Sequence, residues 1–145
     1  MTDPYTAVAE FARVLKPNGI GVFSIPNYSN IEKRFRYFTT GSLTRPKTVE
    51  DYEKAGRTLF NFHNSPLTIT LLDFMFAINH LRVEQILRDK IKRKQYFFYP
   101  LVLLMRLAAI LASEHSRRKN RFDITLKDEV ILGGNTLIFI VRNVQ

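Results

Sequence analysis

The sequence predicts an α/β fold in which helices and strands alternate along 145 residues. Short apolar runs of strand length lie between Gly and Pro residues, and longer segments repeat their apolar residues at helical spacing. The composition, 46% hydrophobic and 24% charged, is typical of a globular chain and excludes a collagen-like or broadly disordered one. Cysteine is absent, which excludes disulfides, thiolate metal sites and cysteine nucleophiles.

The first two elements are a helix and a buried strand. Pro4 suits the first position of an amphipathic helix over residues 4–15, and the Lys-Pro-Asn-Gly turn at 16–19 ends it. Residues 20–25 form a short apolar run bounded by Gly and Pro, which favours a strand. The loop at 26–30 follows the carboxyl end of that strand, where open α/β sheets bind ligands.

The rest of the chain supplies further elements around one irregular region. Residues 31–66 are less regular, and we expect a variable lid or insertion there. A helix is predicted over 69–79 and a strand over 81–87. Two strand-like runs, 129–132 and 136–141, flank a Gly-Gly-Asn turn. About three strands in total are few for a self-sufficient sheet.

Most of the net charge of +9 is concentrated in one stretch. Residues 88–121 hold 10 Lys/Arg against 2 Asp/Glu, and we interpret them as a basic, apolar helical insertion. Its apolar run, 96–112, has 17 residues, fewer than the roughly 20 that span a bilayer, and only Arg106 interrupts it. The residues predicted to contact a membrane surface or a lipophilic acceptor are Tyr96, Phe97, Phe98, Tyr99 and Arg106.

Residues 88–121 have two other interpretations, of which the first stays open and the second is disfavoured. A core helix whose hidden face packs on another part of the domain would have the same composition. Binding of nucleic acid is disfavoured, because the aromatic residues are clustered rather than interleaved with the basic ones.

Three residues are candidates for a substrate site. Asn27 and Tyr28 lie in the loop after the first strand and are predicted to bind substrate, although Asn after Pro also simply forms turns. His63 is the candidate general base, because imidazole titrates near neutral pH; a packing role before a helix is the alternative. The three histidines lack the spacing of metal ligands, so we predict no metal site.

Several strings of residues resemble the late part of class I S-adenosylmethionine-dependent methyltransferases of the small-molecule group. Arg13-Val14-Leu15-Lys16-Pro17 is similar to the family's R-x-L-K-P-G-G helix end, and Pro26-Asn27 to the pair that ends its fifth strand. His63, Leu67-Thr68 and residues 79–83 resemble the family's H…F-T…L…A-G-F-x-V segment. Asn18 and Asn79-His80-Leu81 depart from these patterns. The last strand resembles the seventh, which is antiparallel to its neighbours.

The resemblance implies a partial Rossmann-like fold over residues 1–145. It implies about three strands of a mixed sheet, flanking helices, S-adenosylmethionine as cofactor and methyl transfer to a small acceptor, a lipophilic one being an option. The family's glycine-rich first loop, its acidic ribose ligand and its adenine-binding Asp all precede the matched region. We therefore expect this chain alone not to bind the cofactor, and a missing N-terminal half or partner chain to supply these residues.

Two alternative functions follow from the same residues. The chain could be a non-catalytic half-domain that pairs with another chain, or a peripheral membrane-associating module that acts through residues 88–121. The N-terminus lacks a basic segment followed by an apolar run, so no signal peptide is predicted. The expected location is cytoplasmic, with attachment to the membrane surface as an option.

Overall fold

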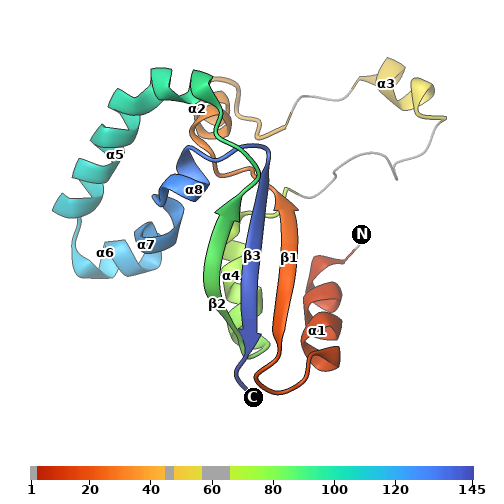
Figure 1. Cartoon of the computed structure of the whole chain (residues 1–145). Helices are drawn as coiled ribbons and strands as arrows, with labels where there is room; N and C mark the ends of the chain where they lie inside the picture. The colour runs from red at the N-terminus through yellow and green to blue at the C-terminus, as the bar shows by residue number, and fades with distance from the viewer. Residues whose placement is uncertain (1–2, 45–47, 57–65) are drawn as a thin grey trace.

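The computed structural model describes residues 3–44, 48–56 and 66–145. The described strands form one sheet, and the helices lie around it (Figure 1). The elements follow in the order α1 (Pro4–Val14), β1 (Ile20–Pro26), α2 (Ile31–Thr40), α3 (Val49–Lys54), α4 (Ile69–Ile78), β2 (Leu81–Arg88), the 3-10 helix η1 (Arg93–Phe98), α5 (Tyr99–Leu111), α6 (Glu114–Lys119), α7 (Phe122–Thr125), α8 (Asp128–Ile131) and β3 (Thr136–Asn143). The predicted α/β class is confirmed.

The sheet has the strand order β1-β3-β2, and β3 is antiparallel to both of its neighbours. In the middle row of the sheet, Phe139 of β3 lies opposite Phe23 of β1 and Ile86 of β2. The antiparallel last strand is therefore confirmed, but the expectation of a mixed sheet is wrong for the described residues. β1 and β2 run in the same direction, yet β3 separates them, so no two described strands pair in parallel.

Local sequence signals set the first elements. The Asp3 carboxylate caps α1 by accepting hydrogen bonds from the N–H groups of Tyr5 and Thr6. Asn18, at a φ of 58°, makes the left-handed turn into β1. Gly21 lets α1 approach the sheet closely, because a Cβ there would lie 2.3 Å from the ring of Phe11.

The main core lies on one side of the sheet, between the strands and helices α1 and α4 (Figure 1). Phe76 of α4 is fully buried and makes edge contacts with Phe23 at 5.4 Å and Phe139 at 5.9 Å. On the opposite face, Ile20 and Val22 of β1 are 55% and 63% exposed. The sheet is thus packed on one face, while the other face leaves apolar side chains uncovered.

The expected strand at 129–132 is wrong, because these residues belong mainly to helix α8. The N–H groups of Val130 and Ile131 both donate to the carbonyl of Lys127, which closes a helical turn. A run of four residues, of which Val130, Ile131 and Leu132 are apolar, is too short to display a period, so sequence alone does not separate a strand from a helix here. Val130 packs in the main core and Ile131 in a second cluster with Ile31 and Val102.

The two insertions predicted from the sequence differ in how they pack. In the expected lid, α2 begins at the fully buried Ile31, whereas α3 has no buried residue. The apolar run of the second insertion divides into η1 and α5, with Pro100 in the first turn of α5. α5 and α6 form an arc on the β2 side of the sheet, away from β1 (Figure 1).

Candidate functional site

The loop after β1, residues 27–30, is fastened to the start of β3 through Asn27. The Asn27 N–H donates to the carbonyl of Asn135 at 2.7 Å, and its side-chain Nδ2 donates to the carbonyl of Val130 at 2.9 Å. Its Oδ1 accepts from the N–H of Ser29 at 3.0 Å. Asn27 is 2% exposed, so these protein contacts occupy its amide and fix the path of the loop.

Asn30 performs a similar task at the other end of this loop. It is fully buried; its Nδ2 donates to the carbonyl of Gly134 at 3.0 Å, and its Oδ1 caps α2 through the N–H of Lys33 at 2.9 Å. Glycine is needed in this turn because a Cβ on Gly133 would lie 1.9 Å from the Glu129 carbonyl oxygen and 3.1 Å from Nδ2 of Asn27. The Gly-Gly-Asn turn is therefore a packing element of the loop.

Arg34 joins the loop to the helices beyond it. Its Nε donates to the carbonyl of Ser29 at 2.7 Å, and its guanidinium also donates to the carbonyl of Thr125 in α7. Burial lowers the pKa of Arg34 to about 10, so the side chain remains a cation at neutral pH. One partly buried charge thus connects α2, the loop after β1 and α7.

Tyr28 lies beside Asn27 and is 9% exposed. Burial raises the pKa of its phenol above the ordinary value of 10, so the hydroxyl stays protonated well beyond neutral pH. The structure therefore brings Asn27 and Tyr28 together at the carboxyl end of β1. Their contact with a substrate stays a prediction, and His63 lies outside the described residues.

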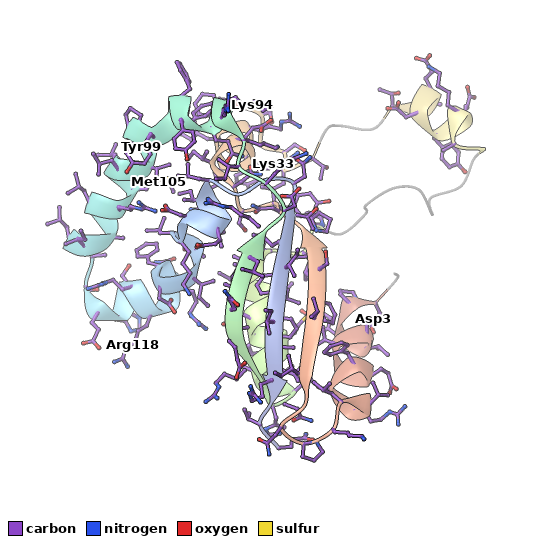
Figure 2. The ribbon with its side chains drawn as sticks, in the orientation of Figure 1. Asp3, Lys33, Lys94, Tyr99, Met105 and Arg118 are labelled. Atoms are coloured by element: carbon purple, nitrogen blue, oxygen red, sulfur yellow. The ribbon has the colours of Figure 1, made fainter. Side chains whose placement is uncertain are left out.

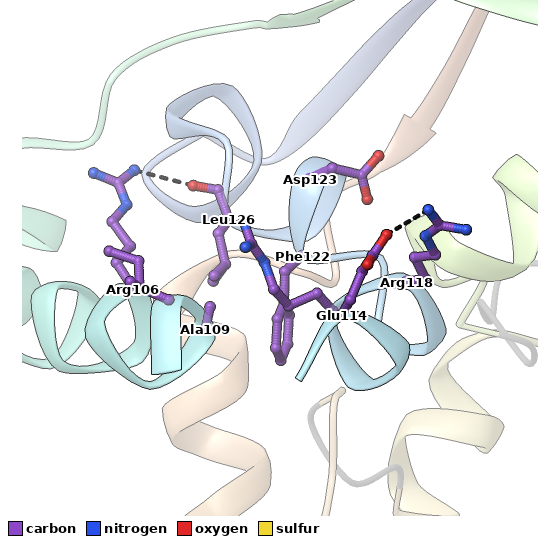
Figure 3. Close-up of a pocket in the computed structure, with 9 residues that line it drawn as sticks. Arg106, Ala109, Glu114, Arg118, Phe122, Asp123 and Leu126 are labelled. Atoms are coloured by element: carbon purple, nitrogen blue, oxygen red, sulfur yellow. Dashed lines mark hydrogen bonds and ion pairs between the residues drawn. The ribbon is translucent and has the colours of Figure 1, made fainter. Parts of the chain in front are cut away.

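A groove of about 680 Å³ lies between α5, α6 and α7 (Figure 3). Arg106 donates to the carbonyl of Leu126 at 3.0 Å and pairs with Asp128, and Arg118 pairs with Glu114. Arg117 has no ion pair among the described residues. The groove combines basic side chains with an apolar wall; its lining is Arg106, Ala109, Ile110, Glu114, Arg117, Arg118, Phe122, Asp123 and Leu126.

The residues predicted to contact lipid or a lipophilic acceptor lie in two directions. Tyr96, Phe97 and Tyr99 are 50%, 85% and 44% exposed. Phe98 turns inward, with its ring centroid 5.1 Å from that of Phe35. Arg106 also turns inward, toward its two partners near α8. The first three residues are accessible to a partner, and the other two hold the helical insertion on the domain.

Two polar residues near η1 were not found by sequence reasoning. Gln95 is 1% exposed, and its amide has no hydrogen-bond partner within the described ranges. Glu32 of α2 lies 3.3 Å from the ammonium groups of both Lys92 and Lys94. Burial opposes the ionisation of Glu32, but the hydrogen bonds and charges of the two lysines outweigh it and lower its pKa. No local pattern signals the ion pairs of Glu32, since they join residues about 60 positions apart in the chain.

The described residues contain no cluster of metal ligands, but they do contain one long apolar helical segment. In the ranges 3–44, 48–56 and 66–145, no three His, Asp or Glu side chains are grouped to hold a metal ion. One helical segment there, Arg93–Leu111, has 19 residues and is long and apolar enough to cross a membrane by length and composition alone. Length therefore does not exclude that this segment spans a membrane.

Comparison with protein-family models and with curated protein sequences found no match.

Proposed function

We propose that this chain is the C-terminal half of a class I S-adenosylmethionine-dependent methyltransferase. We also propose that it acts together with further strands, which add to the free edge of β1. The observation that carries the proposal is the position of β3, antiparallel between β1 and β2. The family resemblance implies a last strand that is antiparallel to its neighbours. The motif Arg13-Val14-Leu15-Lys16-Pro17 and the pair Pro26-Asn27 flank β1, where the family's fifth strand would lie.

The free edge of β1 supports the addition of further strands. Odd-numbered residues of this segment bond to β3, as in the bonds between Asn27 and Asn135 and between Gly19 and Asn143. In an antiparallel pair, the alternate residues turn their backbone groups the other way. The N–H and C=O groups of Val22 and Ser24 therefore face an edge that no described strand occupies.

Helix α1 gives a second, independent reason to expect a neighbour there. It lies beside β1 on the side of the free edge (Figure 1). Val8 and Ala12 on its inner side are buried, while Tyr5 and Val14 are 49% and 66% exposed. A helix that covers an added strand as well as β1 would bury such apolar residues.

The loop after β1 would form one wall of the acceptor pocket. Methyl transfer from a sulfonium depends mainly on holding the acceptor in line with the methyl group. The buried amides of Asn27 and Asn30 and the cation of Arg34 fix this loop, and Tyr28 presents a neutral phenol beside it. We assign positioning of the loop to the first three and contact with the acceptor to Tyr28.

S-adenosylmethionine does not fit the described residues by themselves. None of the three strands is followed by the glycine-rich loop that the family uses for the methionine part of the cofactor, and the Gly133-Gly134 pair packs against Glu129 and Asp89 instead. The proposal therefore assigns cofactor binding to the added strands. By itself, this chain would supply the acceptor side of the site.

The proposal is tested by reading the DNA immediately upstream for a frame that encodes a glycine-rich loop after a first strand. The product of that frame is coexpressed with this chain, and the pair is titrated with S-adenosylmethionine by calorimetry. We expect copurification and micromolar binding by the pair, and no binding by this chain alone. Clear binding by the isolated chain, or a pair that forms and does not bind the cofactor, would contradict the catalytic proposal.

A stable pair without cofactor binding favours the alternative function, a non-catalytic half-domain. The matched variant for both outcomes is Val22→Lys, which places a charge at the free edge without disturbing the core. This variant should prevent copurification, whereas Val49→Lys on the exposed helix α3 should leave it unchanged.

A further inference from the structure

Helix α5 has two apolar faces, and only one of them packs on the protein. On the inner face, Val102 and Ala109 are 0% and 7% exposed, and Val102 packs in the cluster with Ile31, Ile131 and Leu132. A surface helix normally carries polar residues on the face turned away from the core. The outer face of α5 instead carries residues that are 44% to 85% exposed: Tyr99, Leu103, Leu104, Leu107, Ile110 and Leu111.

The charges around α5 are arranged at its two ends. The outer face has no charged residue, and the one charge within α5, Arg106, turns inward to Leu126 and Asp128. Basic side chains stand before and after the helix, and Lys94 and Arg118 mark the two ends of the arc in Figure 2. Within the described ranges, Arg93, Arg117 and Lys119 have no acidic partner.

The missing strands do not account for the uncovered face of α5. Added strands would extend the sheet from β1, whereas α5 lies beyond β2 at the opposite side (Figure 1). A core helix would also be mostly buried, yet only 17% of the apolar segment that includes η1 and α5 is buried. An anionic membrane fits both the uncovered apolar face of α5 and the basic side chains at its ends. Acyl chains would accept the leucines, and lipid phosphates would attract the basic side chains.

We propose that the outer face of α5 docks this protein on the surface of an anionic membrane, with Tyr96 and Phe97 of η1 entering the same interface. α5 lies along the surface rather than across the bilayer. The segment Arg93–Leu111 is long enough to cross a membrane, so packing and not length decides its orientation: the contacts of Val102 and Arg106 hold the inner face of α5 on the domain. This docking is independent of the proposed function, since it requires no cofactor.

The test is co-sedimentation with vesicles made of an equal mixture of phosphatidylcholine and phosphatidylglycerol, compared with phosphatidylcholine alone. Wild-type protein should bind the mixed vesicles in a salt-sensitive way. Leu104→Gln with Leu111→Gln should weaken binding about a hundredfold at unchanged charge. Arg117→Gln with Lys119→Gln should weaken it about thirtyfold. Two matched controls, Val14→Gln and the pair Arg13→Gln with Arg82→Gln, should bind like wild type.

A fluorescent reporter keeps the proposal testable if the leucine variant does not fold. The chain has no tryptophan, so Phe97→Trp places a single indole at an 85% exposed position of the interface. Its emission should shift to shorter wavelength when mixed vesicles are added, whereas that of Tyr5→Trp should not. Absence of preference for the anionic vesicles, or an unshifted Phe97→Trp emission, would overturn the proposal. So would a leucine variant that turns a dimer into a monomer while wild type ignores lipid.

Discussion

The two edges of the sheet are built differently. β2 carries Arg82, Glu84 and Arg88, its register with β3 shifts between Val83 and Gln85, and Glu84 pairs with Arg142 of β3. β1 has an unbroken register over Ile20–Pro26 and no charged side chain. Charges and bulges are the usual means of preventing strand addition. Among the described strands, β2 therefore has the features of a protected edge, whereas β1 is open to the addition of a strand.

The largest effect is expected where both edges depend on the same residue. Phe139 of β3 is 1% exposed and packs against Phe76, so Phe139→Ala should lower the free energy of unfolding by about 3–5 kcal/mol. Ile140→Ala, on the uncovered face, should lower it far less. Urea unfolding monitored by circular dichroism measures both. Equal losses for the two variants would show that the core is not one-sided.

A smaller loss is expected at the carboxyl end of β1 alone. Asn27→Ala removes the donor to the Val130 carbonyl and leaves buried polar groups without partners, which should cost about 1–3 kcal/mol of stability. The matched control is Asn135→Ala, whose side chain is exposed. The same unfolding assay applies, and if both variants lose equally, the buried amide of Asn27 does not fasten the loop.

Adding a charge to the β1 edge and removing one from the β2 edge should change association in opposite directions. Val22→Lys should lower the self-association constant of the isolated chain about tenfold, while changing stability by less than about 0.5 kcal/mol because Val22 is 63% exposed. Arg82→Val removes a charge from the β2 edge and should raise the constant. Sedimentation over a range of concentrations measures both. No change in either variant would mean that neither edge controls association.

The smallest effect concerns the contact between α2 and η1 on the β2 side. The pKa of Glu32 is lowered in the folded protein, so ionised Glu32 stabilises the fold above its usual value of 4.5, and this contribution is lost as pH falls through the folded pKa. At neutral pH, Glu32→Gln should cost up to about 1 kcal/mol. The stabilities of wild type and variant should converge in acid. A constant difference from neutral to acid pH would contradict the assigned charge contact.

Local signals made most elements predictable. The Asp3 cap, the turn at 16–19 and the Thr68 cap carry their own hydrogen bonds, so the local sequence predicts α1, β1 and α4 close to their observed bounds. The prediction of a mixed sheet is wrong for the described residues, because strand pairing is decided by residues far apart in the chain. The pairing of Phe23 with Phe139 is an example.

The structural role of the candidate site was less accessible from the sequence. Asn27 was identified from its place after a strand, but its bond to the Val130 carbonyl spans 103 residues and has no local signature. Arg106 was expected to face lipid, and it turns inward because Leu126 and Asp128, on a later turn of the chain, accept its hydrogen bonds. Periodicity and capping patterns are local, so they do not predict which distant residues bond to a polar side chain.

Amide hydrogen exchange measured by NMR tests whether the edge of β1 is open. At low protein concentration, the N–H groups of Val22 and Ser24 should exchange at least about ten times faster than those of Phe23 and Ile25, which bond to β3. Addition of the partner that completes the sheet should slow the first pair selectively. Equal protection of all four amides in the isolated chain would show that the edge is already covered, and would contradict the account.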